Sequence, residues 1–291
     1  MKKVLSLFLA LVLVFAAGCG TAAPAGEPES PAEEPASDAE PSASVTEDRK
    51  ISILFIGNSA TSRNYMAKEI FKKFARAAGY DVSVTMISEG GHTLAEFADP
   101  ADEFGNMVDI ALRGSKKYDF VVLQEQTLRP AGKDVAKFYA AVRSLAERVR
   151  QNGATPVLYV TAPRKEGSAD LTANGWTVES MTWRVAAAYA AIGQELDIPV
   201  AYAGLAFYDI CTNHPEIELY DPDLSHPSYT GSYLVAITLA AEIFDVDPTT
   251  VDYSVRIPEA EAPILKEAAR KAVFETPEIP AEYVTSSLGV E

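Results

Sequence analysis

Three short segments of the sequence carry residue types that suit nucleophilic catalysis. The Gly-Asn-Ser segment at 57–59 puts a hydroxyl after an apolar run, where the N-terminus of a following helix favours developing negative charge. The segment at 89–93 holds paired glycines, whose backbone can approach a ligand closely. The segment at 223–226 places an Asp three residues before a His. At that spacing the carboxylate can fix the histidine tautomer and leave Nε2 free to accept a hydroxyl proton.

Each segment taken singly also fits a plainer structural interpretation. Gly-Asn-Ser turns cap helices, paired glycines form ordinary turns, and an Asp ahead of a helix is a common N-cap. The sequence holds three histidines, at positions 92, 214 and 226. His226 has an acid, Asp223, at this spacing and precedes a predicted helix, so the three segments together favour a nucleophile, a base and an orienting acid.

Strand and helix patterns alternate from about residue 49 and must position these segments. We expect strands at 51–56, 81–87, 119–123, 156–160 and 198–202, of which 51–56 and 119–123 read as buried. We expect helices at 64–78, 93–113 with a break near Pro100, 133–151, 177–196, 229–244 and 259–274. This alternation predicts an α/β fold, a three-layer α/β/α sandwich with a mostly parallel sheet of about five strands. Right-handed crossovers then bring the strand C-termini to one edge, where sites of such folds lie.

The order and spacing of the three segments resemble the SGNH hydrolases, also called the GDSL esterase/lipase superfamily. Residues 53–59 match the first block of that family, residues 90–94 resemble the second, and residues 223–227 match the last. The resemblance spans about residues 50–245 and implies the flavodoxin-like SGNH hydrolase fold.

The resemblance also implies a catalytic role for each matched position. Ser59 is the expected nucleophile, His226 the base and Asp223 the acid that orients it. The oxyanion hole is expected to include the backbone N–H groups of Ser59 and Gly91. The implied reaction is two-step acyl transfer through an acyl-enzyme, which requires no metal or cofactor.

Two positions depart from the family pattern. Asn58 stands where Asp is usual, and we assign it, together with His92, as a candidate substrate contact. After the third strand the family has Gly-x-Asn-Asp, whose Asn donates to the oxyanion, but this chain has Val-Leu-Gln-Glu-Gln-Thr. By register Gln126 takes the place of that Asn, and Gln124, nearer the strand end, is the alternative donor.

A cation site is the other chemistry that the last segment suggests. His214, Glu216 and Asp221 precede Asp223 and His226 closely, and all are types that ligate metals. We assign no metal here, because Asp223 and His226 have a better-fitting role as acid and base.

The N-terminus resembles that of a bacterial lipoprotein. Two lysines precede an apolar run at 4–17, and Ala-Gly-Cys follows at 17–19, so residues 1–18 are read as a signal peptide. By the resemblance, Cys19 is lipidated and holds the protein outside the cytoplasm on a membrane. The alternative is an ordinary secretory signal that contains a cysteine. Residues 20–48 contain five prolines and eight acidic residues, and predict that 19–48 form a disordered tether.

The remaining residues, 49–291, are expected to form one domain, with 275–291 as a loose tail. The composition of the chain indicates which classes of partner this domain can bind. The 291 residues include 25 basic and 41 acidic residues, a net charge of −16, which disfavours nucleic-acid binding. We expect a monomeric, surface-anchored serine esterase that acts on small acyl esters, with O-acetyl groups on carbohydrate as the leading substrate. The alternatives are an O-acyltransferase using the same residues and a non-catalytic glycan-binding lipoprotein on an esterase scaffold.

Overall fold

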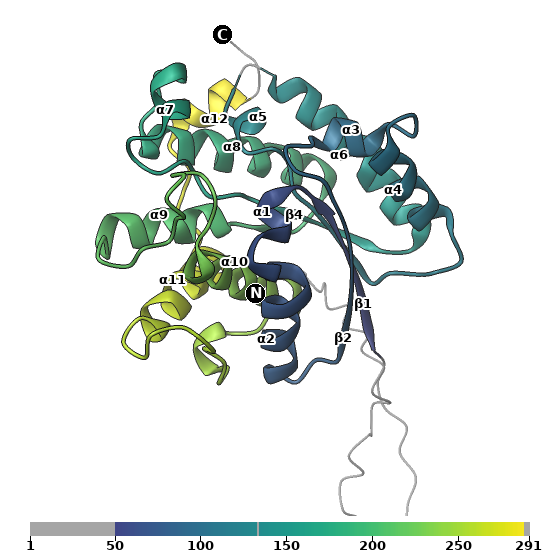
Figure 1. Ribbon diagram of the computed structural model, residues 1–291. Coiled ribbons are helices and arrows are strands. Elements are labelled where there is room, and N and C mark those ends of the chain that lie inside the picture. Colours follow the sequence, from purple (N-terminus) through teal and green to yellow (C-terminus); the bar gives the residue numbers. More distant parts are fainter. Residues whose placement is uncertain (1–49, 133, 288–291) are drawn as a thin grey trace, which may run out of the picture. The chain divides into compact units, whose positions relative to one another are not determined.

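A parallel five-stranded sheet forms the centre of the protein in the computed structural model, which describes residues 50–132 and 134–287 (Figure 1). The strands are β1 Ile51–Gly57, β2 Val82–Ser88, β3 Phe120–Leu123, β4 Thr155–Tyr159 and β5 Val200–Ala201. Their order across the sheet is β2-β1-β3-β4-β5. The predicted sheet is therefore confirmed. The signal peptide, Cys19 and the tether lie outside the described residues.

Strand β1 is apolar along most of its length because helices cover both faces of the sheet. Ile53 and Phe55 are fully buried in the core on one face, and Leu54 and Ile56 are fully buried in the core on the other. Successive strand side chains point to opposite faces, so a strand buried on both sides needs a continuous apolar run.

Helices on the two faces complete the three layers (Figure 1). The first face is covered by the π-helix η2 Met66–Phe71, α2 Lys72–Ala77, α9 Ala203–Asn213, α10 Tyr229–Phe244 and α11 Ala262–Phe274. The second face is covered by α3 Leu94–Ala98, α4 Glu103–Arg113, α5 Leu128–Ala131, α6 Val135–Asn152, α7 Ala169–Asn174 and α8 Val178–Leu196. The predicted three-layer α/β/α sandwich is confirmed.

The helix predicted at 64–78 is divided in the structure. The short helix α1 Ser59–Ser62 and the 3₁₀ turn η1 Arg63–Tyr65 come before η2. Asn64 and Tyr65 have φ angles of 53° and 56°, a left-handed backbone that cannot continue a right-handed helix. The nucleophile candidate thus begins a separate helical turn of its own.

Helices α1, α5, α7, α9 and α12 (Ala281–Ser287) lie where the sequence analysis placed none. α9 begins directly after the short strand β5, and its apolar residues continue those of the strand, which hides the change of element. We expected 275–291 to be a loose tail, but Ala281–Ser287 form helix α12, which lies against α8. The tail expectation is therefore wrong for this segment. The short 3₁₀ turn η3 Pro248–Thr250 lies between α10 and α11.

The strand order places a crevice between the C-terminal ends of β1 and β3. The chain crosses from β1 to β2 on one side and then returns to β3 on the other. Ligands of doubly wound sheets bind at such a switch point, outside the carboxyl ends of the strands. Ser59 follows β1 and Gln126 follows β3, so both residues belong to this edge.

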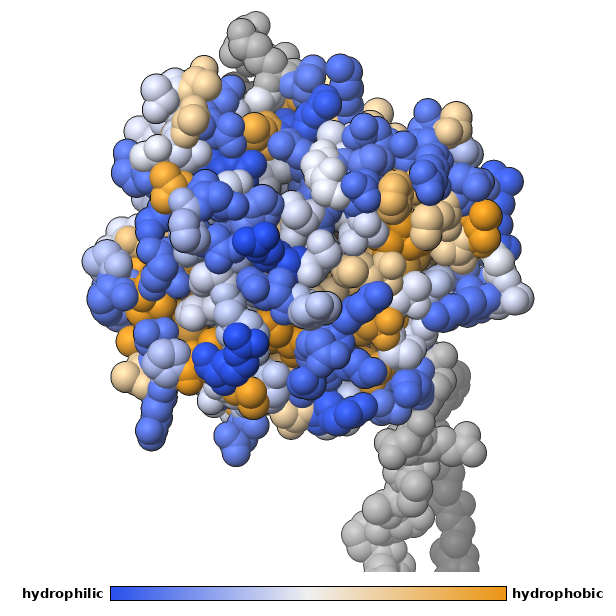
Figure 2. Space-filling view, in the orientation of Figure 1, coloured by the Kyte–Doolittle hydropathy of each residue, from blue (hydrophilic) through white to orange (hydrophobic). Residues whose placement is uncertain are grey.

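The face of the molecule seen in Figure 2 is covered largely by hydrophilic residues, with smaller hydrophobic patches between them. Among the exposed large hydrophobic side chains of the described residues, Met107 and Ile110 belong to α4. Within 50–132 and 134–287, no helix is both long enough and apolar enough to span a bilayer.

Candidate active site

Ser59, His226 and Asp223 form a continuous chain of hydrogen bonds. His226 Nε2 lies 2.8 Å from Ser59 Oγ, and His226 Nδ1 lies 2.7 Å from Asp223 Oδ2. With its proton on Nδ1, the imidazole donates to the carboxylate and accepts from the hydroxyl. This is the geometry that activates a serine nucleophile.

The Asp223 carboxylate is held ionised by its own loop. Its Oδ1 accepts the backbone N–H groups of His226 at 2.8 Å and of Ser225 at 3.0 Å. Chiefly through the His226 N–H, and then through the imidazole, these bonds lower the pKa of Asp223 to about 2. Leu224 adopts a left-handed φ of 59° to form the loop, a strain typical of functional sites.

Ser59 is the first residue of α1 and Asn58 is its N-cap. Asn58 Oδ1 accepts the N–H of Ala60 at 3.2 Å. Gly57 makes the turn possible, because a Cβ at this position would lie 2.5 Å from Gln124 Oε1 and from Thr61 Oγ1. The hydroxyl therefore stands at a helix N-terminus, where the free N–H groups face developing negative charge.

Asn58 holds the site together from within the protein. Its side-chain amide donates to the His92 carbonyl at 2.9 Å, and its backbone N–H donates to Gln124 Oε1 at 2.8 Å. The residue borders the cavity but is 4% exposed. Its polar side-chain atoms are engaged by protein, and a substrate contact by Asn58 stays a prediction.

The imidazole of His92 points away from the crevice. Its Nε2 lies 3.3 Å from Asp102 Oδ2, and its ring packs against Phe97 and Phe104. His92 is not among the residues that border the cavity beside Ser59. Aromatic packing and the Asp102 carboxylate hold the ring, and a substrate contact by His92 stays a prediction.

The structure separates the two glutamines that follow β3. Gln124 is fully buried, and its amide donates to Asn58 Oδ1 and to the Glu125 carbonyl. Gln126 instead borders the cavity together with Gly91 and Ser59. Its Oε1 accepts the N–H of Leu128 at 3.0 Å, which fixes the orientation of the amide. Of the two glutamines, Gln126 is thus the one that borders the cavity.

Glu125 is a functional candidate that the sequence analysis missed. It is 1% exposed, and its Oε1 accepts the N–H of Leu94 at 3.1 Å and that of Gln126 at 2.6 Å. Burial raises the pKa of Glu125 to about 7. This carboxyl links the segment behind Gly91 to Gln126. The signal that could have identified Glu125 is an acid directly after a buried strand, at the edge where the site was expected.

The segment after Ser59 is tied to the loop that carries His226. Arg63 Nε donates to Asp221 Oδ2 at 2.8 Å, and Asn64 Nδ2 donates to the Pro227 carbonyl at 3.0 Å. Asp221 is therefore paired with Arg63, while His214 Nδ1 lies 3.3 Å from Glu216.

The acids and histidines considered as cation ligands do not converge. In the described part of the chain, no group of three or more His, Cys, Asp or Glu side chains is arranged to hold a metal ion.

Ser59 and His226 open on a cavity of about 210 Å³. It is bordered by Asn58, Ser59, Ala60, Gly91, Gln126, Thr127, Tyr159, Thr161, Ala162, Arg164, Ser225, His226, Pro227 and Val235. A shallower depression of about 470 Å³ adjoins it and shares Gly91 and Gln126. Ser59 thus borders the smaller cavity, while Gly91 and Gln126 border both spaces.

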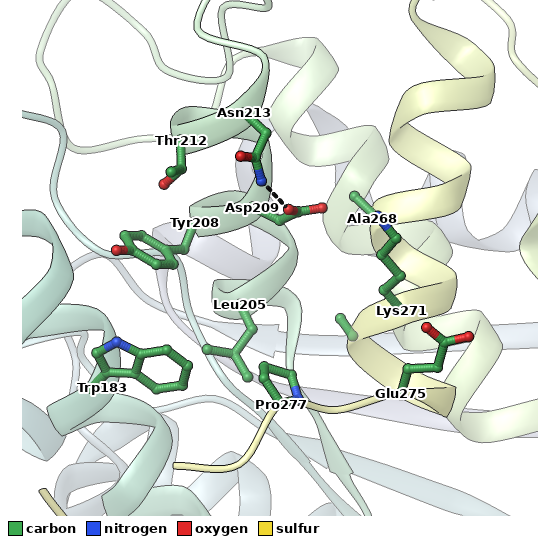
Figure 3. A pocket seen from close by; sticks show the side chains of 11 residues that line it. Trp183, Leu205, Tyr208, Asp209, Thr212, Asn213, Ala268, Lys271, Glu275 and Pro277 are labelled. Carbon is green, nitrogen blue, oxygen red and sulfur yellow. Dashed lines mark hydrogen bonds between the residues drawn. The ribbon is translucent and has the colours of Figure 1, made fainter. Parts of the chain in front are cut away.

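A second cavity, of about 300 Å³, lies away from this chemistry between α8, α9 and α11 (Figure 3). Trp183 and Tyr208 stand on one side of it and Lys271 and Glu275 on the other. In this cavity the side-chain amide of Asn213 donates a hydrogen bond to Asp209 Oδ1 at 2.6 Å. None of the three triad residues borders this cavity, so it offers a place to bind but no nucleophile with a base.

Comparisons with known proteins place these observations in a family. No model of a protein family matches the sequence, and no curated protein matches it either. Among solved structures, a DUF4886 family protein from Bacteroides uniformis ATCC 8492 has a TM-score of 0.63 at 16% identity. The match covers 80% of this chain and 98% of that one, and at this identity it shows the fold alone.

A protein from Slackia heliotrinireducens, described as an SGNH hydrolase, is more similar in sequence. It is 32% identical, with a TM-score of 0.58, and the match covers 67% of this chain and 100% of that one. The match extends over the whole of that relative. The chain belongs to the SGNH hydrolase family.

Proposed function

We propose that this hydrolase is a serine esterase that removes small acyl groups, and that its substrates are O-acetyl groups on carbohydrate. The observation that carries the proposal is the chain of hydrogen bonds from Asp223 through His226 to Ser59, which ends in a cavity. A hydroxyl activated in this way attacks an ester carbonyl.

The reaction follows from the positions of the polar groups. Ser59 Oγ attacks the carbonyl carbon while His226 Nε2 takes the hydroxyl proton, and Asp223 stabilises the imidazolium. The N–H groups of Ser59 and Gly91 and the amide of Gln126 are the proposed donors to the oxyanion. The alcohol leaves with the proton from His226, and water then attacks the acyl-enzyme by the same steps in reverse.

The dimensions of the site support a small acyl group. The cavity of about 210 Å³ is smaller than the 300–1,000 Å³ that is typical of drug-sized ligand sites. It therefore suits an acetyl group better than a long acyl chain. The adjoining groove, which contains Arg129 and Asp134, offers polar side chains to the rest of an extended molecule such as a glycan.

We also propose that the enzyme is a monomer attached to the outer side of a bacterial membrane through a lipid on Cys19. The support is in the sequence: the apolar run at 4–17 and the small residues before Cys19. The acidic, proline-rich residues 20–48 would then hold the catalytic domain away from the membrane surface.

The proposed activity is tested with the purified protein on 4-nitrophenyl acetate, 4-nitrophenyl palmitate and acetylated monosaccharides. We expect acetate release from the sugars and a clear preference for acetyl over palmitoyl esters. A serine-reactive fluorophosphonate should label Ser59, as located by peptide mass spectrometry. A protein that binds acetylated glycan but neither hydrolyses it nor is labelled would be the non-catalytic lipoprotein instead.

A further inference from the structure

Arg164 belongs to the lining of the cavity beside Ser59. Arg164 lies in the connection between β4 and α7, and it borders the same cavity as Ser59 and His226. Its side chain is 13% exposed. A nearly buried cation next to an ester site needs a partner, because burying an unpaired charge is costly.

Only the Nε donor of this guanidinium makes a hydrogen bond within the described residues. Arg164 Nε donates to Asp170 Oδ2 at 2.7 Å. Within the described residues, neither terminal nitrogen, Nη1 or Nη2, has a hydrogen-bond partner. Asp170 is 40% exposed and is not among the residues that border the cavity. The guanidinium is thus anchored at one edge, and its donors beyond Nε remain available to a ligand.

The rest of the lining suits a ligand that carries oxygen atoms. Arg164 is the only residue with a fixed positive charge among those bordering this cavity, and none of them is an Asp or Glu. Thr161, which also borders it, is 2% exposed, and its Oγ1 has no hydrogen-bond partner. The positive charge of Arg164, with no carboxylate in the lining to oppose it, favours an anionic oxygen ligand.

Arg164 is held in a fixed position relative to the base. The backbone N–H of Lys165 donates to the Leu224 carbonyl at 3.0 Å, and Tyr220 Oη donates to the Pro163 carbonyl at 2.9 Å. These bonds join the segment at 163–165 to the loop that carries His226. A group held by Arg164 would therefore keep its position with respect to the reacting ester.

We propose that Arg164 binds a carboxylate of the substrate, so that the preferred esters are acetylated acidic sugars of the uronic acid class. The inference rests on the proposed esterase function, because it places the carboxylate beside an ester held at Ser59. A planar guanidinium matches a carboxylate through two parallel hydrogen bonds. Since the chain has a net charge of −16, an anionic substrate needs such a local cation.

The test compares two matched esters on the full-length enzyme: an acetylated methyl glucuronoside and the same acetyl ester of methyl glucoside. We expect wild type to have the higher kcat/KM on the glucuronoside. Arg164→Gln should lower the ratio of the two kcat/KM values by about 10–100-fold, the range for charge-assisted hydrogen bonds. Arg164→Lys should recover only part of the ratio, because it keeps the charge and loses the planar fork.

Arg143→Gln is the matched control. Arg143 is exposed on α6, and its guanidinium pairs with Glu195 at 2.6 and 2.7 Å, away from the cavity. This variant loses the same charge and should leave the ratio unchanged. Circular dichroism of each variant shows whether it has folded.

Three outcomes would overturn the proposal. The first is an equal loss on both esters in Arg164→Gln, and the second is a wild type without preference for the acid. In the third, Arg164→Gln lowers the kcat/KM for 4-nitrophenyl succinate relative to 4-nitrophenyl acetate but leaves the ratio of the two sugar esters unchanged. That result would mean that Arg164 binds a carboxylate in the acyl group.

If wild type hydrolyses neither sugar ester, the proposal of carbohydrate O-acetyl substrates fails. Titration of glucuronate into wild type and Arg164→Gln then decides the carboxylate site separately. Binding that requires Arg164 supports the site, and binding that does not require it, or no binding, overturns it.

Discussion

The side-chain carbonyl of Gln124 accepts the backbone N–H of Asn58 at 2.8 Å, while the Gln124 amide donates to the Asn58 side chain at 3.0 Å. This pair joins the end of β3 to the turn that presents Ser59. Gln124 also occupies the space where a Cβ on Gly57 would lie. The geometry of the nucleophile turn therefore depends on a glutamine that does not reach the cavity.

The two glutamines should give different phenotypes when replaced by alanine. Gln124→Ala leaves buried hydrogen-bonding groups of Asn58 without partners, so the free energy of unfolding should fall by about 2 kcal/mol or more. Gln126→Ala removes a donor that acts on the transition state, so kcat should fall by about 10²–10³ with KM and stability less affected.

Urea denaturation and steady-state kinetics on both variants distinguish these effects. A loss of kcat in Gln124→Ala at unchanged stability, with Gln126→Ala active, would reverse the assignment.

Ser59 and His226 should act as one unit. Ser59→Ala and His226→Ala should each remove nearly all esterase activity, and the double variant should lose little more, because either change alone disables the same step. Hydrolysis of 4-nitrophenyl acetate measures all three, with Arg143→Gln as the folded control. Additive losses would mean that the two residues do not share one mechanism.

Asp223 should remain ionised far below neutral pH. Hydrogen bonds from His226 and Ser225 lower its pKa to about 2, so the stability that this carboxylate contributes is present above its unfolded pKa and is lost as the pH falls through about 2. Asp223→Asn should lose no more activity than His226→Ala, since it disturbs the tautomer and leaves the base.

Steady-state kinetics compare the loss of activity in Asp223→Asn with that in His226→Ala. Acid denaturation of wild type and Asp223→Asn measures the stability that the carboxylate contributes. Titration of the wild-type carboxylate near pH 4, followed by NMR, would contradict this account of the loop.

Glu125 should make the protein less stable as the pH rises through the range from about 4.5 to about 7. Burial raises its folded pKa to about 7 from an ordinary value of 4.5, so the folded state binds more protons than the unfolded state within this range. The loss amounts to at most about 3 kcal/mol. Thermal denaturation across this range should show a flatter profile for Glu125→Gln than for wild type.

The exposed Glu166→Gln removes an equal charge and serves as the control. If both variants keep the wild-type slope, the carboxyl of Glu125 does not titrate in this range.

Cys19→Ala should release the protein from membranes or leave its precursor uncut. Lipid attachment requires the thiol, and the apolar run at 4–17 is short for a spanning helix. Cell fractionation with labelling by a palmitate analogue measures both effects. A variant that is processed and membrane-bound like wild type would show that the lipoprotein interpretation is wrong.

The fold could be predicted where a pattern is local. The apolar run of β1 and the amphipathic pattern of α6 can each be recognised from a few neighbouring residues. The divided helix after Ser59 could not be predicted, because the left-handed Asn64 is stabilised by Pro227 and Ser232, far away in the sequence.

The same limit applies to the site. The Asp-x-x-His spacing acts within one loop and was readable from the sequence. The direction of the His92 ring depends on Phe97, Phe104 and Asp102, and the burial of Glu125 depends on helices from other parts of the chain. Neither property is encoded by neighbouring residues alone.

The distance along the chain between the two halves of the triad has a consequence for how the enzyme matures. Ser59 and His226 are 167 residues apart in sequence, and the supporting bonds from Arg63 and Asn64 span 158 and 163 residues. Contacts this distant pay a large loop-closure entropy before they form, so they slow folding. Most of the chain must therefore be translated and folded before Ser59 meets its base, and a nascent or truncated chain carries an unactivated hydroxyl.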